Sequence, residues 1–130
     1  MALRERDIGG SGHLYHAVTV ELLDIARVAW LHRFVSADLV EQYVVANLDI
    51  TYRREVTRAD RELTVCIRVQ RIGTSSLTLH EEMTNPDGLV VATCRTTIVA
   101  FMPYGGASRP LTRAEIARAE SFRADVALDT

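Results

Sequence analysis

The stretch Leu14-Tyr-His-Ala-Val-Thr-Val-Glu-Leu-Leu-Asp-Ile-Ala-Arg-Val-Ala-Trp-Leu-His-Arg-Phe-Val35 decides the fold of this chain. In it, apolar residues recur every three or four positions, a spacing that predicts one α-helix over 14–35. Further apolar side chains widen this stripe until little of the circumference is polar, which is typical of a helix buried inside a domain. The exception is a narrow polar line made of His13, His16, Asp24 and Arg27, with Glu21 at its edge.

The rest of the chain is dominated by alternating apolar and polar residues, the period of half-buried β-strands. This alternation predicts strands over 46–53, 63–70, 76–82 and 89–102, and residues 3–7 are compatible with a further short strand. Four consecutive strands joined by tight turns favour an antiparallel meander. The sequence therefore predicts an α+β fold in which one antiparallel sheet wraps around one long buried helix.

The end of the chain carries the signature of a short helix. Thr112 stands in the capping position and Glu115 follows three residues later, as a capping box requires. The many charges of 112–122 indicate that this helix lies on the surface. With 130 residues and neither an internal repeat nor a linker, we expect a single domain over 1–130.

Composition excludes several function classes. All 15 basic residues are Arg and none is Lys, which excludes Schiff-base chemistry and a phosphate-loop lysine. A net charge of −2 provides no field that would attract nucleic acid. No apolar run is long enough to span a membrane, and the charged N-terminus does not resemble a signal peptide.

The two cysteines and the open sheet bear on location and assembly. Cys66 and Cys94 are isolated in apolar surroundings, which favours reduced thiols in a cytoplasmic protein and gives no metal-ligand spacing. We expect neither a metal nor a cofactor. One sheet around one helix leaves a sheet face and its edges uncovered, so a partner subunit is expected, in a homodimer or tetramer.

Several stretches resemble a known family. Arg6-Asp-Ile-Gly-Gly-Ser-Gly-His13 and the following Leu22-Leu-Asp-Ile-Ala-Arg27 are similar to the signature of hotdog-fold acyl-CoA thioesterases of the 4-hydroxybenzoyl-CoA thioesterase group. Val69-Gln-Arg-Ile-Gly-Thr-Ser-Ser76 and the hairpin around Pro86-Asp-Gly88 fit later segments of that family. The resemblance implies a hotdog fold and hydrolysis of an acyl-CoA or acyl-carrier-protein thioester.

The chain departs from the family at the residue that usually carries the chemistry. The second Asp of the family's Asp-x-Asp pattern is replaced by Gly9, and Tyr15 and His16 stand where two Asn residues are usual. The role of the missing carboxylate therefore cannot be carried over. This departure leaves an alternative open, a non-catalytic hotdog protein that binds an acyl or polyketide-like ligand.

The start of the helix is the expected site of carbonyl polarisation. Unpaired N–H groups and the positive end of the helix dipole point there, and such a site stabilises an oxyanion. By resemblance, the donor is a backbone N–H near His16. His13 or His16 could also act as a base near neutral pH, or merely fix the turn and line the pocket.

Asp24 is the leading candidate for the catalytic carboxylate. Another branch of hotdog thioesterases places its carboxylate on the helix about two turns beyond the oxyanion site, where Asp24 lies. A structural alternative of similar weight is a pair between Asp24 and Arg27. Glu21, one turn earlier, is the weaker candidate.

The resemblance also implies a contact region for coenzyme A. The family uses the strand-to-strand loop here to hold the nucleotide and pantetheine, and an Arg with nearby hydroxyls can hold phosphate. The expected substrate-binding residues are Tyr15, Glu21, Arg71, Thr74, Ser75 and Ser76. The structural alternative for the loop is a tight turn with exposed hydroxyls.

Overall fold

The computed structural model describes residues 2–4 and 16–123. The helix predicted from periodicity is confirmed as α1, His16–Trp30, and the chain continues as a π-helical turn, η2, Leu31–Val35. A short 3-10 helix, η3, Asp38–Glu41, leads into the sheet. The remaining elements are β1 (Tyr43–Tyr52), η4 (Arg58–Asp60), β2 (Thr64–Ile72), β3 (Ser76–Thr84), β4 (Val90–Ala100) and α2 (Arg113–Glu120).

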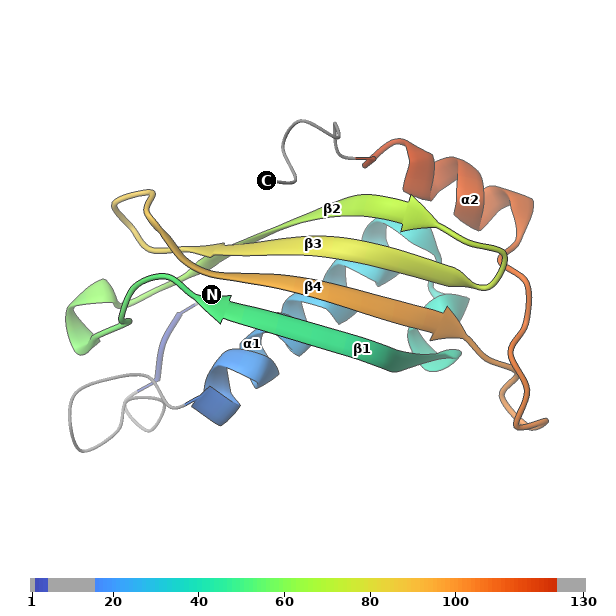
Figure 1. Ribbon diagram of the computed structural model, residues 1–130, viewed down its shortest axis with the longest axis horizontal. Coiled ribbons are helices and arrows are strands. Elements are labelled where there is room, and N and C mark those ends of the chain that lie inside the picture. The colour runs from blue at the N-terminus through green and yellow to red at the C-terminus, as the bar shows by residue number, and fades with distance from the viewer. Residues whose placement is uncertain (1, 5–15, 124–130) are drawn as a thin grey trace.

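The four strands form one antiparallel sheet in the order β1-β4-β3-β2 (Figure 1). The prediction of a four-strand meander is therefore wrong for β1, which pairs with β4 instead of β2. The physical reason is the connection over 53–63, which is too long for a tight turn, contains η4, and carries the chain across the end of the sheet. Only β2, β3 and β4 follow one another as a meander.

β1 begins earlier than the alternation predicted. It starts at Tyr43. The alternation did not reveal these first residues, because a β-bulge between Val45 and Asn47 inserts one extra residue and breaks the alternation there. Beyond the bulge the predicted alternation is confirmed, since Leu48 and Ile50 are partly buried and pack against the core.

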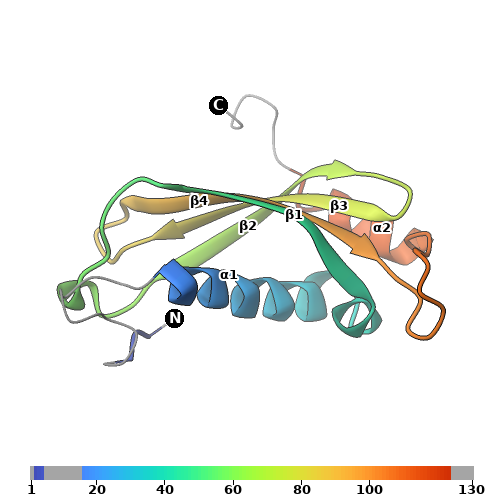
Figure 2. The same cartoon turned by 60° about the horizontal axis from the view of Figure 1, so that its bottom comes forward.

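α1 lies against one face of the sheet, as Figure 2 shows. Leu22, Leu23 and Trp30 are buried beneath the strands. The opposite side of α1 is open, and the side chain of Ile25 is 49% exposed. The prediction that the helix is buried all round therefore fails within one chain, because a single sheet covers only the side that it contacts.

The far face of the sheet is polar. The register aligns Arg68, His80, Arg95 and Asp49 in one row across the four strands, on the side away from α1. None of the described helices is long and apolar enough to cross a membrane. Exposed apolar side chains of the described chain lie on α1, at Ile25, and on the edge strand β1, at Val44, Val45 and Tyr52.

The capping box predicted for the last helix is confirmed. The Thr112 side chain accepts a hydrogen bond from the backbone N–H of Glu115, and the Glu115 carboxylate accepts one from the N–H of Thr112. Arg109 also donates to both carboxylate oxygens of Glu115, at 2.9 and 3.0 Å. Burial by itself raises the pKa of Glu115, but these hydrogen bonds lower that pKa to about 2.

Candidate active site

The first turn of α1 contacts the last residue of β1. The Nδ1 atom of His16 is hydrogen-bonded to the phenol of Tyr52, and the two rings meet edge-on with centroids 5.4 Å apart. Burial raises the pKa of Tyr52, and a hydrogen bond with Thr19 partly opposes this. His16 thus lies at the described start of the helix, where the sequence predicted it. His13 and Tyr15 lie outside the described residues.

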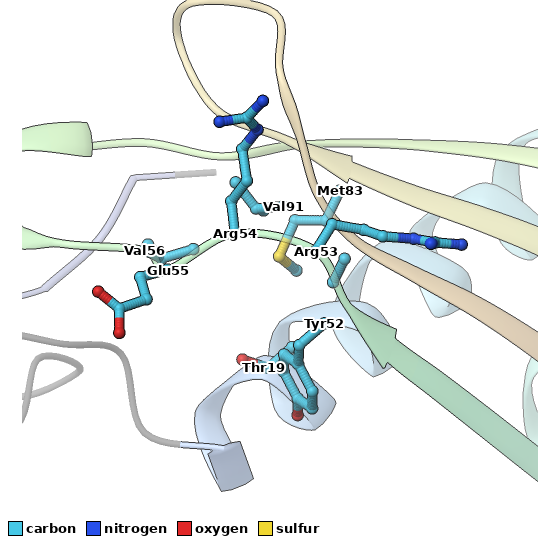
Figure 3. A pocket seen from close by; sticks show the side chains of 9 residues that line it. Thr19, Tyr52, Arg53, Arg54, Glu55, Val56, Met83 and Val91 are labelled. Atoms are coloured by element: carbon cyan, nitrogen blue, oxygen red, sulfur yellow. The ribbon is translucent and has the colours of Figure 1, made fainter.

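A pocket of about 380 Å³ opens beside this helix start (Figure 3). Its wall is formed by α1, by the end of β1 and the residues that follow, and by β3 and β4. The lining residues are Thr19, Tyr52, Arg53, Arg54, Glu55, Val56, Met83, Val91 and Ala92. Sequence reasoning missed this pocket, although the adjacent Arg53 and Arg54 at the end of a strand were a usable signal.

Asp24 lies on α1 in a three-residue ionic cluster. Its Oδ1 atom accepts a hydrogen bond of 2.8 Å from Nη1 of Arg27. The Nε and Nη2 atoms of Arg27 donate to the two carboxylate oxygens of Glu81 on β3, at 2.7 and 2.8 Å. Arg27 and Glu81 are completely buried, whereas the Asp24 side chain is 57% exposed. The predicted pairing of Asp24 with Arg27 is thus present.

Further polar groups complete the cluster inside the sheet. The Thr96 hydroxyl donates to Glu81 at 2.8 Å and lies 3.2 Å from the Cys94 sulfur. Burial raises the pKa of the Cys94 thiol to about 11. Burial alone would lower the pKa of Arg27, but the hydrogen bond and charge of Glu81 outweigh it and raise that pKa. Arg27 is therefore a permanent cation, and Cys94 is a protonated thiol at neutral pH.

On its open side, Asp24 borders a shallow hollow of about 510 Å³. Ile25, Val28, Ala29 and His32 form the rest of its lining. This hollow is largely apolar and lies on the side of α1 that the sheet does not cover. Glu21 is also exposed there, and it pairs with Arg4 at 3.6 Å.

The predicted coenzyme A loop lies at the other end of the sheet. Thr74 and Ser75 accept backbone hydrogen bonds from Leu111 and Ala100, at 2.9 and 2.7 Å. Ala100 pairs with Tyr43, the first residue of β1, whereas His16 contacts Tyr52, the last. At about 3.3 Å per residue, this ten-residue strand separates the two regions by roughly 30 Å. One chain therefore does not bring Arg71, Thr74, Ser75 and Ser76 to the helix start.

Comparison with known proteins identifies the family. Residues 11–92 match the thioesterase superfamily, and this match spans more than half of the chain. The chain belongs to the thioesterase superfamily. The match includes α1, β1, β2 and β3, and so contains both Asp24 and Glu81. No curated protein matches the chain.

Solved structures of thioesterases share this fold. A Thermus thermophilus thioesterase complexed with coenzyme A and Zn is 29% identical, with a TM-score of 0.81 over 92% of this chain and 93% of that one. The probable thioesterase YbaW from Escherichia coli is 25% identical, with a TM-score of 0.78 over 95% and 96%. A predicted thioesterase from Bacillus stearothermophilus is 22% identical, with a TM-score of 0.82 over 96% and 94%.

These likenesses confirm the α+β hotdog fold, and family membership makes this thioesterase a thioester hydrolase rather than a binding protein only. Among residues 2–4 and 16–123, no group of three or more His, Cys, Asp or Glu side chains could hold a metal ion.

Proposed function

We propose that this thioesterase hydrolyses acyl-CoA thioesters, with the carbonyl polarised at the start of α1 and water activated by Asp24. The observation that carries the proposal is the half-exposed Asp24 carboxylate, which is held through one oxygen by Arg27. In the reaction, Asp24 takes a proton from water, the oxygen bonds to the carbonyl carbon, and the carbon–sulfur bond breaks. The proton then passes to the departing coenzyme A thiolate.

The separation of these groups along α1 supports a site formed by two subunits. From His16 to Asp24 the helix rises by about 12 Å, which is too far for one water molecule to bridge. A second copy of the chain is therefore part of this proposal, as a homodimer or as a tetramer built from dimers. Each catalytic site would combine the helix start of one subunit with Asp24 of the other.

β1 is the edge strand through which we expect this pairing. It is hydrogen-bonded only to β4 within the described sheet, and Val44 and Val45 on it are more than 40% exposed. If two β1 strands pair antiparallel, the Tyr52 end of one meets the Tyr43 end of the other. Because Tyr43 lies beside Arg27, Asp24 of the partner subunit then approaches the helix start. The same pairing moves the loop with Arg71 towards that site.

The relatives support coenzyme A as the carrier, since the Thermus thermophilus structure contains it. Arg71, Thr74, Ser75 and Ser76 are the proposed phosphate and pantetheine contacts, and His13, Tyr15 and Glu21 the proposed groups around the acyl end. An acyl-carrier protein is the other possible carrier. Both cysteines are free, which supports a cytoplasmic location.

Steady-state hydrolysis across acyl-CoA chain lengths, repeated with acyl-carrier-protein thioesters, tests the proposal. We expect turnover of acyl-CoA, and Asp24→Asn should lower kcat by roughly 100-fold because it removes the base. Glu120→Gln is the matched control. Glu120 is also a half-exposed helical carboxylate that pairs with an Arg three residues later. Binding of a CoA thioester that remains intact would contradict the proposal, and an unchanged kcat in Asp24→Asn would exclude Asp24 as the base.

A further inference from the structure

The exposed Asp24 carboxylate is fixed from inside the protein. Its partner Arg27 is completely buried and belongs to the same helix, so the orientation of the guanidinium depends on what binds its other nitrogens. Those nitrogens bind Glu81, which lies on β3, distant in sequence and equally buried. The carboxylate that faces solvent is therefore linked by hydrogen bonds to a carboxylate in the core.

The geometry leaves the Arg27 guanidinium little freedom. A guanidinium is planar, and two parallel hydrogen bonds to one carboxylate fix both its plane and its rotation. Glu81 makes this bidentate contact at 2.7 and 2.8 Å. The third nitrogen, Nη1, is then aimed at Oδ1 of Asp24, at 2.8 Å. No described residue donates a hydrogen bond to Oδ2 of Asp24, which leaves that oxygen for water.

Charge gives Glu81 a second effect on Asp24. One guanidinium lies between two carboxylates, so Glu81 already balances the positive charge of Arg27. Asp24 receives a directed hydrogen bond without the full field of an unbalanced cation. The other polar or titratable groups around the cluster are Tyr43 on β1, Thr96 and Cys94 on β4, and His32 on η2.

We infer that Glu81 is a positioning residue for hydrolysis, which acts through Arg27 to aim the Asp24 carboxylate and to keep it available as a base. This inference rests on the role proposed above for Asp24. It assigns to a core strand residue a function beyond packing. If Glu81 is neutralised, the guanidinium loses its charged bidentate partner and no longer aims the Asp24 carboxylate, and Asp24 alone among the described residues then balances its charge.

A double-mutant cycle tests the inference. In the wild-type background, Glu81→Gln should lower kcat about tenfold and leave KM within about twofold, because orientation of the base is lost while substrate contacts remain. In the Asp24→Asn background, the same substitution should change the residual kcat less than twofold, because the group that it positions is already absent. Equal factors in both backgrounds, or no effect in either, would overturn the inference.

Thr96→Val is the matched control for packing damage. It removes the hydroxyl that donates to Glu81 at 2.8 Å and accepts from Nη2 of Arg27 at 3.3 Å, but leaves the charges of Glu81, Arg27 and Asp24 and the bidentate contact in place. We expect it to lower the melting temperature and to leave kcat within about twofold. A tenfold loss of kcat in Thr96→Val would show that any disturbance of the core reduces activity, and would overturn the inference.

Arg27→Lys serves as the second variant if Glu81→Gln does not fold. A lysine ammonium keeps the charge but cannot hold two carboxylates in one plane. Arg27→Lys should lower kcat in the wild-type background and change the residual kcat little in the Asp24→Asn background. Equal factors in both backgrounds would overturn the inference. The outcomes also separate the two proposals. A wild-type protein without turnover refutes both, whereas an active wild type with a deficient Asp24→Asn and an additive cycle refutes only the role of Glu81.

Discussion

Two arginines organise ionic clusters in this molecule, and they differ in what they leave open. Arg109 binds Glu115 at the start of α2, where both carboxylate oxygens accept hydrogen bonds and the side chain is 3% exposed. Arg27 binds Glu81 in the same closed manner, but its remaining nitrogen holds Asp24, which is 57% exposed. A buried carboxylate with both oxygens engaged in hydrogen bonds supports the fold, whereas an exposed one held through a single oxygen can also accept a proton.

Removal of Arg27 should produce the largest loss of stability. Arg27→Met leaves the Glu81 carboxylate buried without its cation, and breaking such a buried pair costs about 3–5 kcal/mol. Urea unfolding at pH 7 measures this cost as a lower midpoint. A loss below about 1 kcal/mol would mean that water reaches Glu81, and the contrast between the two clusters would disappear.

Neutralisation of Glu115 should cause the second-largest loss of stability, and the size of this loss should depend on pH. Its pKa of about 2 in the folded state lies below the ordinary value of 4.5 for a glutamate, so the stabilisation is fully present above about pH 4.5 and is lost as the pH falls towards 2. Glu115→Gln should cost roughly 3 kcal/mol at pH 7 and little at pH 2. Unfolding curves at both pH values measure this, and kcat should not change. A pH-independent cost would contradict the ionic origin.

Thr96→Val should have a smaller effect. It removes the hydroxyl that donates to the buried Glu81 carboxylate at 2.8 Å, a hydrogen bond to a charged group that is worth about 1.5–3 kcal/mol. The melting temperature of the variant measures the loss. Stability equal to that of the wild type would show that the two bonds from Arg27 satisfy Glu81 without help.

Of these substitutions, Asp24→Asn should have the smallest effect on stability. It should have the largest effect on kcat. Half-exposed ion pairs contribute about 0–1 kcal/mol, and Glu81 continues to balance Arg27 in the variant. Unfolding should therefore change by less than about 1 kcal/mol while kcat falls. A stability loss as large as that of Arg27→Met would place Asp24 with Glu115, as a support of the fold.

Local patterns in the sequence predicted the helices and strands. They could not predict which residues far apart in the sequence contact one another. Periodicity indicated α1 and the strands, and the spacing of Thr112 and Glu115 predicted the cap, because these signals depend on neighbours in the chain. The pairing of β1 with β4 has no such local signal. It depends on how the segment over 53–63 crosses the sheet.

The alternation of apolar and polar residues in β3 already marked Glu81, the partner of Arg27, as an inward-facing residue. Glu81 is in phase with Leu77, Leu79 and Met83 on β3, all of which face the core. A charged carboxylate at an inward position is costly unless it is paired, and an Arg is the natural partner in a chain without Lys. Which Arg is that partner could not be read from spacing, since Glu81 and Arg27 meet only when the sheet packs on the helix.

The bulge in β1 determines which side chains this strand offers to α1. Tyr43 and Tyr52 are the two ends of a ten-residue strand and so lie an odd number of positions apart, and a regular strand would direct them to opposite faces of the sheet. The inserted residue at Ala46 changes the phase, and both phenols face the helix, one beside Arg27 and the other beside His16. β1 thereby contacts α1 both near His16 and near Arg27, at the two ends of the helical stretch that separates the helix start from Asp24.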